Sequence, residues 1–110
     1  MKKSTIALSC AGILGLGLLA SANLFAADAG KGKETFEGNC GVCHNADSAD
    51  TKVGPGLKGL YKKEKLANGK KPSDASVTAM INEGGNGMPS FGDILTAAEK
   101  ADLVAYLKTL

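Results

Sequence analysis

The chain opens with a stretch whose pattern differs from everything after it. Two lysines are followed by an uncharged, mostly apolar run from Ile6 to Ala22, and the first acidic residue is Asp28. A basic start, an apolar middle and a small-residue end are typical of a secretory signal peptide. We therefore expect residues 1–27 to be a signal peptide, cleaved after residue 22, 26 or 27, and residues 28–110 to form one domain.

An uncleaved membrane anchor is the alternative for this leader. The apolar run has 17 residues and contains three glycines, whereas a spanning helix usually needs about 20 apolar residues. Cleavage is therefore favoured, and we expect the exported protein to have no membrane attachment after it.

Beyond the leader, apolar positions recur at helical spacing in short segments, and no segment alternates as a strand would. The pattern predicts helices over residues 29–39, over 74–83 after Ser73 or Asp74, and over 97–108 after a Thr96–Glu99 capping box. A shorter helix is expected over 60–67, and a loop over 45–59. The sequence thus predicts an all-α domain with three to four short helices and long loops.

The segment after the leader is poor in bulky side chains. Its 83 residues (110 − 27) include no Trp and only four aromatic residues, Phe36, Tyr61, Phe91 and Tyr106. Below about 70–80 residues, natural domains often add a disulfide, a metal or a cofactor, and this domain is close to that size. We therefore expect a bulky apolar group to complete the interior.

The cysteines indicate what that group is. Cys10 falls in the leader, which leaves Cys40 and Cys43, followed at once by His44. Cys-x-x-Cys-His is the spacing that attaches a c-type haem covalently. Two intervening residues on a helical turn bring both thiols to one side, where they can reach two vinyl groups, and the adjacent imidazole can bind the iron. The sequence predicts one haem c, held by two thioether bonds, with His44 as an iron ligand.

Three other uses of this motif fit less well. A thioredoxin-like dithiol requires a preceding strand and a βαβ pattern, which are missing here. A structural zinc site requires four ligands, whereas this segment has two Cys and one His. A plain disulfide remains possible but leaves His44 without a role.

The second iron ligand is expected to be Met88. Met opposite His raises the reduction potential of cytochromes c, and the candidates are Met80 and Met88. Met80 follows the apolar spacing of the 74–83 helix, so we expect it in the core. Met88 lies in the glycine-rich loop 84–92, where Pro89 restricts the backbone. Ligation by a lysine or by water is the alternative.

These motifs resemble, in their order along the chain, those of class I monohaem c-type cytochromes of the short bacterial kind. Residues 32–36 resemble the Gly-x-x-x-Phe of the family's first helix. Residues 53–60 resemble its Gly-Pro-x-Leu-x-Gly-Leu loop, and residues 87–91 its Met-Pro-x-Phe loop. The resemblance covers the chain from Gly30 onward and implies the cytochrome c fold around one covalently bound haem.

The resemblance also implies roles for single residues. In that family the first-helix glycine meets the last helix at a close crossing, which implies that Gly32 lies against Leu103 and Tyr106. The loop proline accepts a hydrogen bond from the Nδ1–H of the proximal histidine, which orients the ring. This role is carried over to Pro55 and His44.

A hydrogen-bond donor to the sulfur of Met88 is not assigned by the resemblance. Asn86 and Tyr61 are the two candidates that we consider.

Lysines are concentrated between residues 58 and 71, although the net charge of the whole chain is small. The chain carries +2, and Lys2 and Lys3 account for both charges. With no Arg and no uniform basic field, nucleic acid is not an expected partner. The cluster is either a patch that steers an acidic redox partner or a solvated surface, and the second interpretation is favoured. It comprises Lys58, Lys62, Lys63, Lys65, Lys70 and Lys71.

The function that follows is that of a periplasmic one-electron carrier. With His44 and Met88 both bound, the iron has no open position, so an enzymatic role is not expected. A peroxidase, a ligand sensor or a docking subunit is the alternative. We expect a monomer that meets redox donors and acceptors briefly through a small interface. Haem is attached after export, which indicates the periplasm or an equivalent space.

Overall fold

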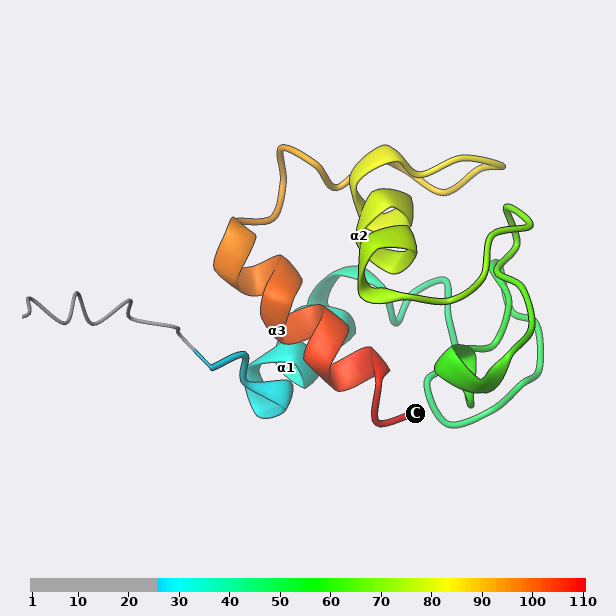
Figure 1. The fold of residues 1–110 in the computed structure, drawn as a ribbon, viewed down its shortest axis with the longest axis horizontal. Helices are drawn as coiled ribbons and strands as arrows, with labels where there is room; N and C mark the ends of the chain where they lie inside the picture. The colour runs from blue at the N-terminus through cyan, green and yellow to red at the C-terminus, as the bar shows by residue number, and fades with distance from the viewer. Residues whose placement is uncertain (1–25) are drawn as a thin grey trace, which may run out of the picture.

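The computed structural model describes residues 26–110, so the predicted signal peptide lies almost entirely outside the described residues. The elements are α1 (Ala29–Asn39), the 3-10 helix η1 (Leu60–Lys62), α2 (Asp74–Glu83) and α3 (Ala97–Leu107). Within residues 26–110 the only strand-like pairing is an isolated bridge between Gly85 and Met88. The predicted all-α fold is confirmed (Figure 1).

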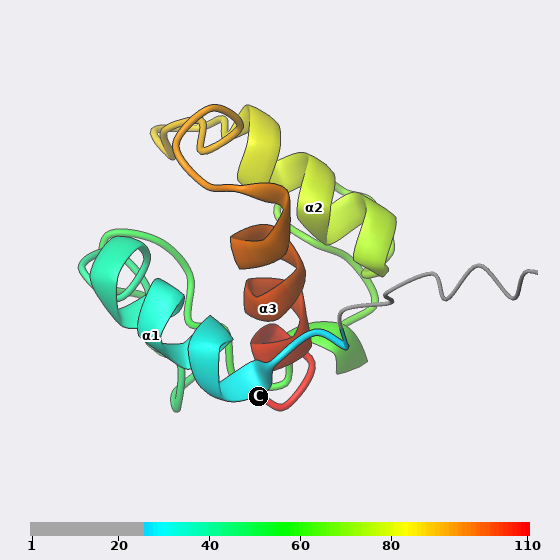
Figure 2. The same cartoon turned by 90° about the vertical axis from the view of Figure 1, so that its left-hand side faces the viewer.

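Helices α1 and α2 lie on either side of α3. Figure 2 shows α3 between α1 and α2, and the long connection from α1 to α2 closes the remaining side in Figure 1. None of the helices in residues 26–110 is long and apolar enough to cross a bilayer.

The crossing of α1 and α3 depends on Gly32. A Cβ at this position would lie 1.9 Å from the carbonyl oxygen of Asp102 and 2.8 Å from Cβ of Tyr106. No side chain fits there, so the expected close crossing is present. Its contact on α3 is the Asp102 backbone together with Tyr106, whereas Leu103 is 1% exposed and belongs to the core.

Side-chain caps define the helix starts. Asp28 accepts hydrogen bonds from the amides of Gly30 and Lys31 at 2.8 and 3.2 Å, and Thr96 accepts one from the amide of Glu99 at 3.1 Å. We predicted a reciprocal capping box at α3, with Glu99 reaching back. The reciprocal box that the structure contains is instead at α2, between Ser73 and Ser76.

The predicted helix over 60–67 is shorter in the structure and ends at Lys62. The backbone of Lys63 is extended, with φ −70° and ψ 151°, and its Nζ donates to the carbonyl of Gly56 at 3.0 Å. The amide of Leu66 donates to the carbonyl of Lys70 at 2.7 Å. Because of these contacts, residues 63–70 form turns instead of continuing the helix.

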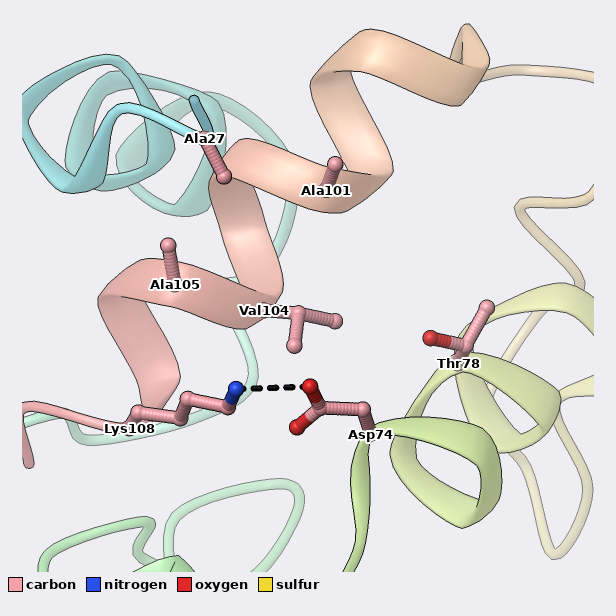
Figure 3. A pocket seen from close by; sticks show the side chains of 7 residues that line it. All are labelled: Ala27, Asp74, Thr78, Ala101, Val104, Ala105 and Lys108. Atoms are coloured by element: carbon pink, nitrogen blue, oxygen red, sulfur yellow. Dashed lines mark hydrogen bonds and ion pairs between the residues drawn. The ribbon is translucent and has the colours of Figure 1, made fainter. Parts of the chain in front are cut away.

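A shallow pocket of about 390 Å³ lies between α2 and α3, with Val104 pointing into it (Figure 3). At one end, Nζ of Lys108 lies 2.6 Å from Oδ2 of Asp74, and the Tyr61 hydroxyl donates to Oδ1 of Asp74 at 3.2 Å. Burial, and then the negative charge of Asp74, raises the pKa of Tyr61 well above its ordinary value. The cluster ties η1 to the start of α2 and the end of α3.

Candidate haem-binding site

The interior of the domain is a shell of apolar side chains around a cavity. The cavity measures about 630 Å³, within the range of about 300–1,000 Å³ usual for cofactor sites. Seven of the nine buried core residues line it. They are Phe36, Leu60, Leu66, Val77, Ile81, Leu103 and Leu107. The core therefore surrounds a space of the kind that a bulky apolar group would fill.

The two cysteines reach this cavity from a turn that continues α1. The amide of Gly41 donates to the carbonyl of Phe36 at 2.9 Å, and the amides of Cys43 and His44 both donate to the carbonyl of Cys40, at 3.0 and 2.9 Å. Both thiols are free and half-buried, and they line the same cavity. The motif thus forms the helical turn that its spacing predicted.

The environment of Cys40 argues against dithiol redox chemistry. Burial, and then the neighbouring Cys43, raises the pKa of the Cys40 thiol to about 11. Reactive redox cysteines have the opposite shift, to about 3.5–7.5, because the thiolate is the nucleophile. At neutral pH Cys40 is therefore a neutral thiol facing an apolar cavity.

His44 is held in one orientation by the loop that follows it. Its Nδ1 lies 2.7 Å from the carbonyl oxygen of Pro55, the contact that the family resemblance implied. A carbonyl can only accept, so this bond puts the ring proton on Nδ1 and leaves the lone pair of Nε2 available to a metal. Gly54 packs against the ring, and a Cβ there would lie 2.5 Å from Cε1 of His44.

Met88 is presented to the cavity by a tight turn. The amides and carbonyls of Gly85 and Met88 exchange hydrogen bonds at 2.9 and 3.0 Å. Between them Asn86 and Gly87 have φ of 52° and 89°, the signs of a type I′ turn, for which Asn-Gly is a preferred pair. The sequence pattern predicts only a glycine-rich loop here, but the Asn-Gly pair is itself a signal for this tight turn.

The loop after Met88 returns to the end of α2. The amide of Phe91 donates to the carbonyl of Ile81 at 2.9 Å, and the Ser90 hydroxyl donates to the carbonyl of Asn82. Both carbonyls belong to the last turn of a helix, where intrahelical partners are missing. The position of Met88 is therefore fixed from both sides of the loop.

The expectations for Met80 and Tyr61 are revised. Met80 is half-buried and lines the cavity rather than being part of the buried core. The Tyr61 hydroxyl is bonded to Asp74, and Tyr61 is not among the residues that line the cavity. Asn86 does line it.

Two exposed valines also belong to the site. Val42 and Val53 are 72% and 78% exposed, and both line the cavity. The two valines thus leave large apolar surfaces open to solvent at the edge of the site. Val42 lies inside the Cys-x-x-Cys-His motif, and Val53 is the first residue of the loop over residues 53–60.

Comparison with known proteins agrees with this geometry. Residues 27–107 match the family described as cytochrome c oxidase, cbb3-type, subunit III. Cytochrome c6 of Synechocystis sp. is 37% identical over 103 residues, covering 93% of this chain and 82% of the relative. The chain belongs to the class I monohaem c-type cytochromes. Cytochrome c6 of Thermosynechococcus vestitus is 33% identical over 107 residues, covering 97% of this cytochrome and 91% of the relative.

The fold of this cytochrome also has a solved counterpart. The crystal structure of cytochrome c6 from the diatom Phaeodactylum tricornutum aligns with a TM-score of 0.57 and 30% identity, covering 74% of this chain and 92% of that one. Membership of the family makes this cytochrome an electron-transfer protein rather than an enzyme, and it implies covalently bound haem c. The cavity volume, the two thiols and the free Nε2 of His44 fit that group.

Proposed function

We propose that this cytochrome is a periplasmic one-electron carrier with a single haem c. Thioether bonds to Cys40 and Cys43 hold the haem, and His44 and Met88 bind its iron. The observation that carries the proposal is that these four residues all line one cavity of about 630 Å³. When bound, the haem supplies the Fe(III)/Fe(II) couple.

The residues of the chain prepare the site for electron transfer without substrate chemistry. Pro55 fixes the tautomer and direction of His44, which strengthens the imidazole as an electron donor. A methionine thioether bound together with histidine in a buried site would favour the reduced state and raise the potential. If His44 and Met88 both bind the iron, no position at the iron would remain for a substrate.

Export accounts for the start of the chain in this proposal. A signal peptide over residues 1–27 would deliver the polypeptide to the periplasm, where the haem is attached. Asp28 caps α1 through its side chain, and its amide lies 2.7 Å from Oδ1 of Asp102 on α3. Cleavage after residue 22, 26 or 27 leaves both contacts in place, so each site is compatible with the fold.

Redox partners are proposed to bind transiently to a monomer. Electron-transfer complexes have small interfaces, below about 1,200 Å². Most members of the lysine cluster are exposed, and we propose that they act mainly as solvated surface, as the sequence favoured.

The test is purification of the full chain from an export-competent host with haem-attachment machinery. The expected mass is that of the chain without its leader plus one haem, and the ferric spectrum should be low-spin with the weak sulfur-to-iron charge-transfer band. Met88→Ala should lose that band and bind CO, whereas the matched control Met80→Leu should keep it. Absence of a Soret band in the exported wild-type protein would refute the proposal.

A further inference from the structure

Two successive carbonyls beside His44 have different donors. The Pro55 carbonyl accepts from Nδ1 of His44 at 2.7 Å. The next carbonyl along the chain, that of Gly56, accepts from Nζ of Lys63 at 3.0 Å in a partly buried position. The ammonium group of Lys63 is thus hydrogen-bonded to the carbonyl of Gly56, one residue after the carbonyl of Pro55 that orients His44.

The segment that carries these carbonyls is packed too tightly to move alone. Gly56 is buried, and a Cβ there would lie 2.3 Å from the carbonyl oxygen of Ser48. The amide of Leu57 donates to the carbonyl of Asn45 at 2.8 Å. These contacts hold the segment from one side, and Lys63 holds it from the side of η1.

Lys63 differs from the other members of the lysine cluster. It is half-buried, and the others are exposed. Within residues 26–110 it is the one cluster lysine whose Nζ makes a hydrogen bond to the backbone, and no carboxylate among those residues forms a salt bridge with it. Its charge is therefore directed at the Pro55–Gly56 turn rather than neutralised.

We propose that Lys63 is a positioning residue of the haem site, whose ammonium group on the Gly56 carbonyl weakens the pull of the neighbouring Pro55 carbonyl on His44 and thereby raises the reduction potential. This inference rests on the proposed ligation by His44. An ammonium on the Gly56 carbonyl makes the electrostatic potential near the Pro55 oxygen less negative, so that oxygen draws the Nδ1 proton less strongly. The imidazole then donates less charge to iron, and the ferric state is less favoured.

Loss of Lys63 should therefore stabilise the ferric state. In a solvent-facing site, a unit charge several ångströms away changes the reduction equilibrium constant by about threefold. For a one-electron couple this corresponds to a fall of about 28 mV, at 59 mV per tenfold.

The experiment compares Lys63→Met with Lys62→Met in the holoprotein. Both variants lose one positive charge at adjacent positions, but Lys62 is exposed and its Nζ makes no backbone hydrogen bond in the structure. We expect the reduction equilibrium constant to fall about threefold in Lys63→Met and to change much less in Lys62→Met. Lys63→Arg, which keeps a donor and the charge, should restore most of the wild-type value.

Solvent exchange of the Nδ1 proton gives a second readout. His44 is the only histidine of the chain, so its ring proton can be followed by NMR. It should exchange several-fold more slowly in Lys63→Met than in Lys62→Met, because the Pro55 oxygen then draws the proton more strongly. Equal potentials and equal exchange rates in the two variants would overturn the role of Lys63. A wild-type spectrum without Met–iron bonding would instead refute the proposed ligation, and the His44 exchange rates would still decide the role of Lys63.

Discussion

Gly54 offers a sharp test of how the loop controls His44. In Gly54→Ala the new methyl carbon would lie 2.5 Å from Cε1 and 2.9 Å from Nδ1 of the imidazole. Contacts this short force the ring or the loop to shift. The methyl group thus acts on the one side chain whose orientation the Pro55 carbonyl fixes.

The expected cost combines two effects. Overpacking of a tight site costs about 1–3 kcal/mol, and weakening the His44–Pro55 hydrogen bond adds about 0.5–1.5 kcal/mol. We therefore expect the free energy of unfolding of the holoprotein to fall by about 1.5–4.5 kcal/mol. A domain with an ordinary stability of about 5–15 kcal/mol remains folded after this loss.

Urea unfolding of the holoprotein, followed by far-UV circular dichroism and Soret absorption, measures this change. Gly41→Ala, in the Cys-x-x-Cys-His motif, is the matched control, because the nearest atom to a Cβ there is 3.6 Å away. It should leave the unfolding free energy within about 1 kcal/mol of the wild type. If Gly54→Ala proved as stable as Gly41→Ala and kept an unchanged ferric spectrum, the close contact with His44 would not be real.

Three further predictions concern other parts of the domain. Gly32→Ala should destabilise the holoprotein by about 2 kcal/mol or more, measured by urea unfolding, because its Cβ would lie 1.9 Å from the α3 backbone; an unchanged midpoint would contradict the crossing. Met88→Ala should bind imidazole at the iron much more tightly than Met80→Leu, measured by absorption titration, and equal affinities would refute Met88 as the ligand. Tyr61 should resist ionisation in an ultraviolet pH titration, because burial and then Asp74 raise its pKa. The stability linked to the neutral phenol is present below its ordinary pKa of about 10 and is lost as pH rises through the higher folded value. Asp74→Asn should therefore lower the titration midpoint of Tyr61, and an unaltered midpoint would exclude the carboxylate as a cause.

Local signals accounted for most of what could be predicted. The start and end of α1 over residues 29–39, the stop of α2 at two glycines and the cap of α3 at Thr96 depend on neighbours within one helical turn. The Cys-x-x-Cys-His spacing is equally local, and so is the turn that it forms. Over residues 60–67 the expected helix was wrong beyond Lys62, because the contacts of Lys63 with Gly56 and of Leu66 with Lys70 replace the helical hydrogen bonds.

Other features arise from contacts that a local pattern does not contain. The aromatic pair of Phe36 and Tyr106, with ring centroids 5.6 Å apart, and the bond between Asp28 and Asp102 join distant segments. The hydrogen bond from Lys63 to Gly56 also depends on how the loop folds back on η1. The sequence alone does not indicate which lysine of a basic cluster donates a hydrogen bond to a backbone carbonyl.

The sequence by itself determined the chemistry, because covalent attachment of a haem and binding of its iron need particular atoms at a fixed spacing along the chain. The sequence predicts those atoms in Cys40, Cys43 and His44, and it offers the thioether of Met88, in a restricted loop, as the second iron ligand. Only the tertiary structure decided how the apolar side chains are used. It arranged seven core residues as a cavity wall and packed Gly54 against His44. These contacts form where separate elements meet, and the order of the elements along the chain does not specify the space between them.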